Sequence, residues 1–176
     1  MTNIEEILTD SGRATADMAV DIISQKPELF SEAYDLCMKQ DGKMSMRAAR
    51  VVWLVAEEMH ALFKPYFSDM VYRLPELTHS SVKRCMLKIL SVYDLSDQEE
   101  LHGIIIDVCF SRVNDPEEEI AVRGYSLQVL ERMIKIYPEV TGELMSALQL
   151  MIESGPDTLS RYAAKRLKRI QRTAIP

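Results

Sequence analysis

The chain has 176 residues, of which 47% are hydrophobic and 27% are charged, a composition typical of one globular domain with a sizeable core. Its six glycines and seven prolines are too few for a collagen-like or low-complexity chain, and no apolar run approaches the roughly 20 residues of a membrane helix. The net charge of −6 weakly disfavours nucleic-acid binding.

The N-terminal sequence and the cysteines indicate a cytoplasmic protein that spans no membrane. Residues 1–12, MTNIEEILTDSG, are acidic and lack the basic-then-apolar layout of a secretion signal. Cys37, Cys85 and Cys109 are far apart and form no C-x-x-C pair, so neither a zinc site nor a disulfide framework is predicted. We expect the three cysteines to be small, buried, apolar residues.

Taken in chain order, the sequence predicts helices almost everywhere, and the helices repeat. Apolar residues recur at steps of three and four, and no segment is a convincing strand. One column of equivalent positions, basic in four of its five members, recurs every 34 to 40 residues: Arg13, Arg47, Lys83, Arg123 and Ser160. A valine or leucine follows seven residues after each of them. We interpret the column as marking the first helix of successive repeated units.

Prolines mark the second helix of three units. Pro27, Pro65 and Pro138 lie 14 to 18 residues beyond their column positions. Proline suits the first turn of a helix because its missing N–H has no helical partner to lose. In the third unit Ser96-x-x-Glu99 has the pattern of a capping box, which predicts a helix that begins at Ser96. Each unit is therefore expected to be a pair of antiparallel helices.

An apolar residue followed by a base near the start of the first helix, as in MR (46–47), VK (82–83) and VR (122–123), resembles the HEAT-repeat and armadillo-like family. The resemblance covers nearly the whole chain and implies an all-α fold. We expect one right-handed α-solenoid domain over residues 1–176, with four to five units of antiparallel helix pairs. The expected units are approximately 10–40, 41–77, 78–114 and 115–154, followed by a capping helix over 156–173.

The same resemblance implies a non-enzymatic scaffold that binds another protein along its second helices, as a monomer or weak dimer. Tyr34 and Tyr72 each follow a proline by seven residues, and this spacing favours the core but leaves a surface position open. No catalytic motif is present and no cofactor is predicted. The expected contact residues are acidic or aromatic: Glu28, Glu32, Tyr34, Asp69, Tyr72 and Glu143.

The C-terminal helix supports an alternative, in which the protein binds nucleic acid or another acidic partner. Its bases surround a narrow apolar face and could contact phosphates. The acidic residues of the second helices have the wrong sign for a phosphate-binding surface, so nucleic acid is the less favoured partner. The basic residues concerned are Arg161, Lys165, Arg166, Lys168, Arg169 and Arg172.

A second alternative is a di-iron carboxylate protein. Glu57-x-x-His60 and Glu99-x-x-His102 place a carboxylate and an imidazole on one side of a helix, as helical di-iron sites require. The segments are shorter than the helices of such bundles, and Glu99 already has a capping role. This hypothesis is therefore less favoured than a scaffold.

Overall fold

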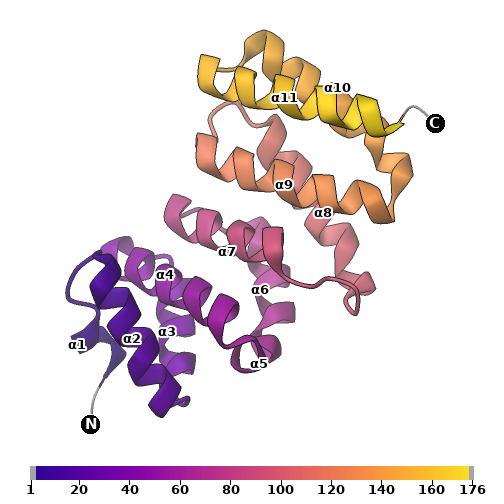
Figure 1. Ribbon diagram of the computed structural model, residues 1–176. Coiled ribbons are helices and arrows are strands. Elements are labelled where there is room, and N and C mark those ends of the chain that lie inside the picture. Colours follow the sequence, from indigo (N-terminus) through magenta and orange to yellow (C-terminus); the bar gives the residue numbers. More distant parts are fainter. Residues whose placement is uncertain (1–2, 175–176) are drawn as a thin grey trace. The chain divides into compact units, whose positions relative to one another are not determined.

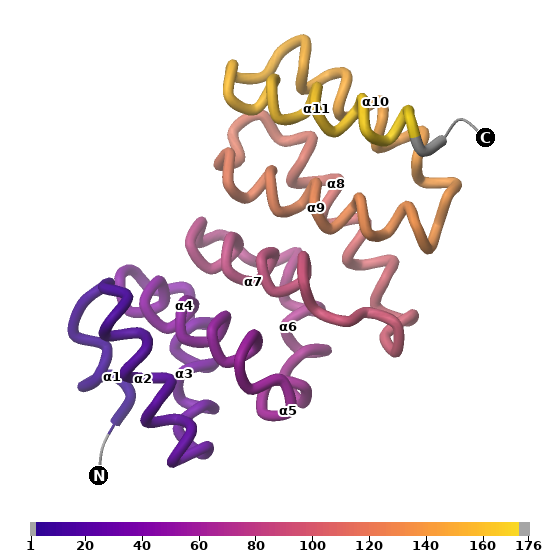
Figure 2. Tube along the Cα trace, in the orientation of Figure 1, coloured from indigo at the N-terminus to yellow at the C-terminus, as the bar shows by residue number. Residues whose placement is uncertain are grey.

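The computed structural model describes residues 3–174, which form helices joined by turns and loops and contain no strand, so the predicted all-α class is confirmed. The helices divide into two compact units, Met1–Leu101 and His102–Pro176. Within each unit the chain reverses direction at short turns between neighbouring helices (Figures 1 and 2). The third predicted unit, 78–114, has its first helix in one compact unit and its second helix in the other.

The first unit consists of two layers of helices. The longer helices α2, α4 and α7 are neighbours in one layer, and α3 packs on α4 from the other layer (Figure 1). The elements are α1 (Ile4–Ile7), α2 (Arg13–Gln25), α3 (Leu29–Met38), α4 (Gly42–Glu58), α5 (His60–Phe63), α6 (Phe67–Arg73) and α7 (Ser80–Val92), with short 3₁₀ turns η1 (Lys64–Tyr66), η2 (Leu74–Glu76) and η3 (Glu99–Leu101).

The second unit repeats this arrangement with fewer helices. Helix α8 packs on α9, α10 packs on α11, and α8 also contacts α10. Helices α9 and α11 therefore belong to one layer, and α8 and α10 belong to the other. The elements are α8 (His102–Asn114), α9 (Ile120–Ile136), η4 (Pro138–Val140), α10 (Thr141–Ser154) and α11 (Asp157–Ala174).

A cluster of aromatic rings fills the first unit between its two layers. Phe63 lies at its centre, with its ring centroid 6.4 Å from that of Phe30, 6.4 Å from that of Phe67 and 5.7 Å from that of Tyr93. Phe67 and Tyr93 stack with their ring centroids 4.3 Å apart. Rings in such tilted or stacked pairs stabilise a core beyond the area that they bury.

Three members of the repeated basic column have structural partners: Arg13 pairs with Asp17 of its own helix, and Arg47 and Arg123 bond to carbonyl groups of preceding elements. Arg47 donates a hydrogen bond to the carbonyl of Leu8, with a nitrogen–oxygen distance of 2.7 Å. The buried Arg123 donates from Nε to the carbonyl of Val113 at 3.1 Å. These bases satisfy carbonyl groups at or beyond the ends of preceding helices, which otherwise lack donors.

Two predicted helix starts are wrong. The capping box at Ser96 does not form, because the helical segment begins only at Glu99 and the N–H of Ser96 is bonded to Oδ1 of Asp94 at 3.0 Å. The second helix of the second pair begins at His60, so Pro65 lies in the 3₁₀ turn η1 between α5 and α6. A 3₁₀ turn tolerates proline because few of its N–H groups have partners.

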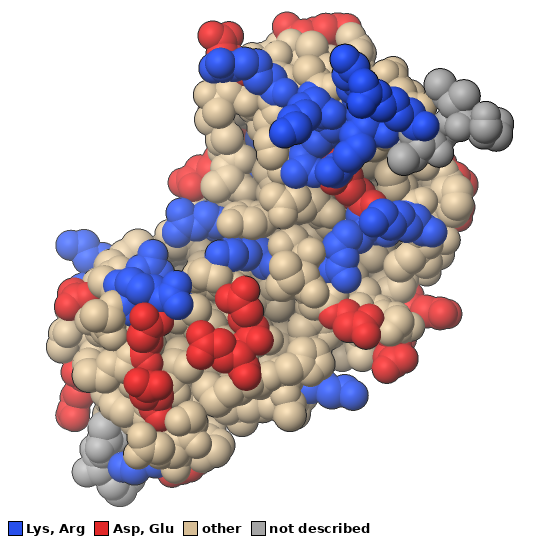
Figure 3. All heavy atoms as spheres, viewed as in Figure 1, with Lys and Arg blue, Asp and Glu red and all other residues tan. Residues whose placement is uncertain are grey.

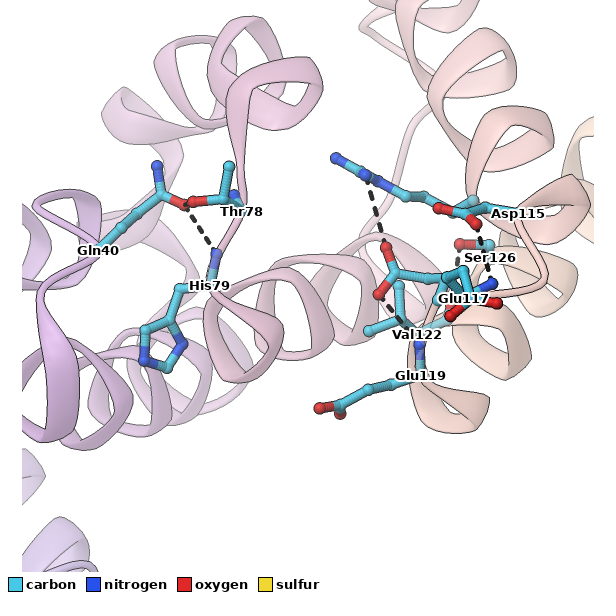
Figure 4. Close-up of polar contacts among 10 residues, drawn as sticks. Gln40, Thr78, His79, Asp115, Glu117, Glu119, Val122 and Ser126 are labelled. Atoms are coloured by element: carbon cyan, nitrogen blue, oxygen red, sulfur yellow. Dashed lines mark hydrogen bonds and ion pairs between the residues drawn. The ribbon is translucent and has the colours of Figure 1, made fainter.

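Polar side chains hold the turns that precede α7 and α9 (Figure 4). In the first unit, Oε1 of Gln40 accepts hydrogen bonds from the N–H groups of Thr78 at 2.6 Å and His79 at 3.1 Å, which ties the end of α3 to the start of α7. In the second unit, Oδ1 of Asp115 accepts from the N–H of Glu117 at 2.9 Å in the turn before α9. Such side-chain bonds satisfy backbone groups that the helices leave open.

The three cysteines are buried, as predicted, and we expect them to resist alkylation. Burial raises the pKa of Cys37 and Cys85, and it raises the pKa of Cys109 from 9.0 to about 12. At pH 8.5 the reactive thiolate of Cys109 is then about a thousandfold rarer than in an exposed thiol. Iodoacetamide followed by mass spectrometry should label all three cysteines in 6 M guanidinium and none within the same minutes without it.

The raised pKa values of the buried thiols make the stability of the protein decrease at high pH. A buried thiol keeps its proton to a higher pH than the thiol of the unfolded chain, so unfolding releases protons above about pH 9. Stability from these groups is fully present below that pH and falls as the pH rises further. Rapid labelling of the native protein, or a rise in stability between pH 9 and 10, would contradict the burial of these side chains.

Candidate protein-interaction surfaces

Charge is separated between the two helical layers. The first-layer helices α2, α4, α7, α9 and α11 contain 16 of the 21 Lys and Arg residues but only 6 of the 27 Asp and Glu residues. The remaining 5 bases and 21 acids lie on the second-layer helices, on α1, on the 3₁₀ turns and in loops. In the first unit, α2, α4 and α7 contain seven bases and four acids, whereas α3, α5 and α6 contain one base and three acids. In the second unit, α9 and α11 contain nine bases and two acids, whereas α8 and α10 contain one base and three acids. Within each unit, therefore, the helices of one layer have a net positive charge and those of the other a net negative charge.

The second layer of the first unit exposes several of the residues predicted to bind a partner. Glu28 precedes α3 and Glu32 lies one turn later, and both are exposed. Oε2 of Glu32 accepts a hydrogen bond from the N–H of Ile4 at 3.3 Å. On α6, Asp69 and Tyr72 are three residues apart and so lie on the same side of the helix. We call the exposed side chains of Glu28, Glu32, Asp69 and Tyr72 the acidic face.

The two equivalent tyrosines differ in position. Tyr34 is only 4% exposed and Tyr72 is 59% exposed. The hydroxyl of Tyr34 donates to Oδ2 of Asp69 at 2.8 Å, and Nε of Arg73 donates to the same oxygen at 2.7 Å. Burial, followed by the bond to Asp69, raises the pKa of Tyr34, which keeps the hydroxyl protonated as a donor. Tyr34 thus holds Asp69 in place from inside, and Tyr72 is the exposed ring.

Glu143, the remaining predicted contact residue, lies in the second unit. It is exposed in the first turn of α10, where an acidic side chain is favoured by the helix dipole. It belongs to the acidic layer of that unit, together with Asp107, Glu139 and Glu153.

Two of the basic residues of the C-terminal helix α11 form ion pairs within the protein. Arg166 and Arg169 of α11 both pair with Oε2 of Glu131 on α9, and the guanidinium of Arg166 lies 4.1 Å from the centre of the Tyr162 ring. The other four predicted bases are exposed, and Figure 3 shows Lys and Arg side chains gathered over α11. These are Arg161, Lys165, Lys168 and Arg172.

The seam between α9 and α11 contains two adjoining cavities that sequence reasoning did not predict. One, of about 310 Å³, is lined mainly by apolar or aromatic groups that include Ile120, Tyr125 and Tyr162. The other, of about 840 Å³, is lined by a more polar set that includes Lys135 and Arg169. Gln128 lines both cavities, so we treat them as one feature, the α9–α11 groove.

Seams between first-layer helices of the first unit are also imperfectly filled. A cavity of about 50 Å³ beside α2 and α4 is lined by three arginines, Arg47, Arg50 and Arg84, together with Asp10. Between α4 and α7, Nζ of Lys88 lies 3.2 Å from the centre of the Trp53 ring, and the indole N–H of Trp53 is buried without a hydrogen-bond partner among the described residues. Burial lowers the pKa of Lys88, although Glu57 partly offsets the effect.

The two histidines nominated for a di-iron site contact tyrosines. The ring of His60 stacks on Tyr93 with centroids 4.6 Å apart, and Nδ1 of the buried His102 lies 2.9 Å from the hydroxyl of Tyr137. Glu57 and Glu99 are exposed. Among residues 3–174 no group of three or more His, Cys, Asp or Glu side chains is arranged to hold a metal ion.

Comparisons with known proteins identify a family and nothing more specific. A family model described as a HEAT repeat domain matches residues 5–169. Comparisons with curated proteins and with solved structures give no significant match. No helix in the described part of the chain is long and apolar enough to cross a membrane.

Proposed function

Because this chain belongs to the HEAT repeat domain family, whose members generally mediate protein interactions, we propose that it is a non-enzymatic scaffold that binds a basic segment of another protein on the acidic face of its first unit. The observation that supports this proposal is the exposed pair of Asp69 and Tyr72 on α6. An aromatic ring beside a fixed carboxylate provides both contact area and charge complementarity for Lys or Arg side chains.

The first unit holds the carboxylate of Asp69 in place. Asp69 accepts hydrogen bonds from Tyr34 and Arg73, so its carboxylate is ordered before a partner arrives. Tyr72 follows in the last turn of α6 and exposes 59% of its surface. A side chain already fixed in its binding position loses less conformational entropy on association than a mobile one. Glu28, which precedes α3, and Glu32 on α3 add negative charge to the same layer.

We expect neutralisation of the acidic face to reduce partner binding without unfolding the protein. The variant combines Glu28→Gln, Glu32→Gln and Asp69→Asn, which keep side-chain size and the ability to accept hydrogen bonds while they remove three charges. Tyr72→Ala is made separately. Each should reduce the recovery of specific partners at least tenfold in quantitative affinity purification from the cells that make the protein, or about 1.4 kcal/mol in binding free energy.

The matched control removes three charges from the second unit with Asp107→Asn, Glu143→Gln and Glu153→Gln. If the control variant loses the partners and the acidic-face variant retains them, the contact belongs to the acidic layer of the second unit. If both variants retain every partner of the wild type, the acidic layer does not bind them. Circular dichroism of each variant checks that the helices are intact.

A further inference from the structure

One end of the α9–α11 groove exposes apolar and aromatic groups to solvent. Ile120, the first residue of α9, is 46% exposed, and the aromatic rings of Tyr125 and Tyr162 line the same cavity. Gly124 lies between Ile120 and Tyr125 along α9, and a Cβ atom added to it would meet no atom within 4 Å. The groove therefore has open space above Gly124, next to apolar groups. The volume of this cavity, about 310 Å³, is in the range of ligand pockets.

Two sets of polar contacts cross the seam and keep the groove in shape. Nε2 of Gln128 on α9 donates to the hydroxyl of Tyr162 on α11 at 3.2 Å, and this hydroxyl lies 3.4 Å from the carbonyl oxygen of Gly124. Further along, Glu131 pairs with Arg166 and Arg169. The groove is thus bounded by fixed helices rather than by loops, which favours a preformed site.

The polar end of the groove is positively charged. Arg132, Lys135 and Arg169 line it, and Glu131, its one acidic lining residue, is shared by two guanidinium groups. Lys165 is exposed on α11, three residues after Tyr162 and four before Arg169, which places it on the same side of the helix as both. An occupant with carboxylate groups would match this charge.

We propose that the α9–α11 groove binds an acidic, amphipathic segment of a protein partner, which places an apolar side chain against Gly124 and its carboxylates near Lys135 and Lys165. The groove runs along α9 from Ile120 to Ile134, about 21 Å at 1.5 Å per residue, which a helix of about 14 residues would span. The phosphates of a nucleic acid could pair with the Lys and Arg side chains, but a nucleic acid has no aliphatic side chain to place in the apolar end. This site is separate from the acidic face and has the opposite charge.

The test uses a fluorescein-labelled 16-residue peptide with leucines at helical i, i+3, i+4 and i+7 spacing and glutamates at the other positions. Fluorescence anisotropy should show binding to the full chain, weakened at least tenfold when serines replace the leucines and also when glutamines replace the glutamates. Gly124→Leu, which fills the floor of the groove, should weaken binding at least tenfold. Gly142→Leu is the matched control, because Gly142 is also helical and has the same open space around an added Cβ.

Charge is tested separately. Lys135→Gln with Lys165→Gln should weaken peptide binding at least fivefold, whereas Lys26→Gln with Lys64→Gln in the first unit should leave it within twofold. Ile120→Asp is a second groove variant at an exposed position, in case Gly124→Leu unfolds the second unit, and should also weaken binding at least tenfold. Thermal melting monitors folding of each variant.

Three results would overturn the proposal. The first is no binding of the acidic peptide up to about 1 mM, a concentration that still detects very weak association. The second is equal binding by the wild type, Gly124→Leu and Ile120→Asp. The third concerns a labelled 16-base-pair DNA duplex and a 16-nucleotide RNA as probes: if either binds more tightly than the peptide and is weakened by the loss of Lys135 and Lys165 but not by Gly124→Leu, the surface binds phosphate groups instead.

Discussion

Phe63→Ala is expected to lower the free energy of unfolding of the first unit by about 3–5 kcal/mol, the range found when a buried phenylalanine is truncated. Phe63 is fully buried, and its ring contacts Phe30 from α3, Phe67 from α6 and the ring of Tyr93. The cavity left by the missing ring is surrounded by other large rings anchored on separate elements. They cannot all move to fill it, so most of the packing is lost.

Urea denaturation of the full chain measures this effect, because the single tryptophan, Trp53, lies on α4 of the first unit and its fluorescence reports on that unit. Tyr72→Ala is the control. It also removes an aromatic ring, but one that is exposed, and should change stability by less than about 0.5 kcal/mol. Equal losses in the two variants would contradict the central position of Phe63 in the core.

Glu131→Gln is expected to destabilise the second unit by about 2–4 kcal/mol, because it removes the charge that two arginines share. The side chain of Glu131 is 11% exposed and that of Arg166 is 15% exposed, so water cannot replace the lost carboxylate for Arg166. Arg169 is much more exposed and would regain solvent contact. The larger part of the cost therefore arises from the desolvated guanidinium of Arg166.

Hydrogen-exchange mass spectrometry of peptides from α9 and α11 measures this loss where it occurs. Glu153→Gln is the matched control: Glu153 on α10 is exposed and accepts a bond from Gln149 at 2.7 Å, so its change should cost less than about 0.5 kcal/mol. In the double variant Glu131→Gln with Arg166→Gln, part of the stability should return, because no charge is left buried alone. A single variant as stable as the wild type would mean that the pair contributes nothing.

The sequence was sufficient to predict the family and the helical repeat, because both follow from buried positions at regular spacing. Val82 and Val122, the apolar residues before the basic column, are fully buried near the starts of α7 and α9. The valine or leucine seven residues after each column position is also buried in the first four repeats. Such positions are determined by burial against neighbouring helices, and burial leaves a clear periodic trace.

Local rules failed where several signals competed. Ser96 and Glu99 have the spacing of a capping box, yet Asp94 captures the N–H of Ser96 in a turn and the helix begins later. The tyrosines seven residues after Pro27 and Pro65 were treated as equivalent. Their surroundings differ, because Tyr34 packs against the rings of Phe30 and Tyr66, whereas Tyr72 is 59% exposed on α6.

The α9–α11 groove left no trace that a single sequence could show. It depends on Gly124 facing open space between two helices that are more than 20 residues apart along the chain. The basic residues of α11 were visible in the sequence, but which two of them pair with Glu131 depends on the distance between α9 and α11. Both features are properties of the packed seam.

The separation of bases and acids between helical layers gives each unit an electric dipole moment across its thickness. The net charge of −6 and the isoelectric point near 5.2 therefore determine which charged surfaces the protein attracts at long range, but not which it attracts at short range. Within about one Debye length, roughly 8 Å at physiological ionic strength, an approaching surface experiences the sign of the nearest layer. At low salt we expect this acidic protein to adsorb to cation-exchange as well as anion-exchange media, because each unit has one basic and one acidic layer.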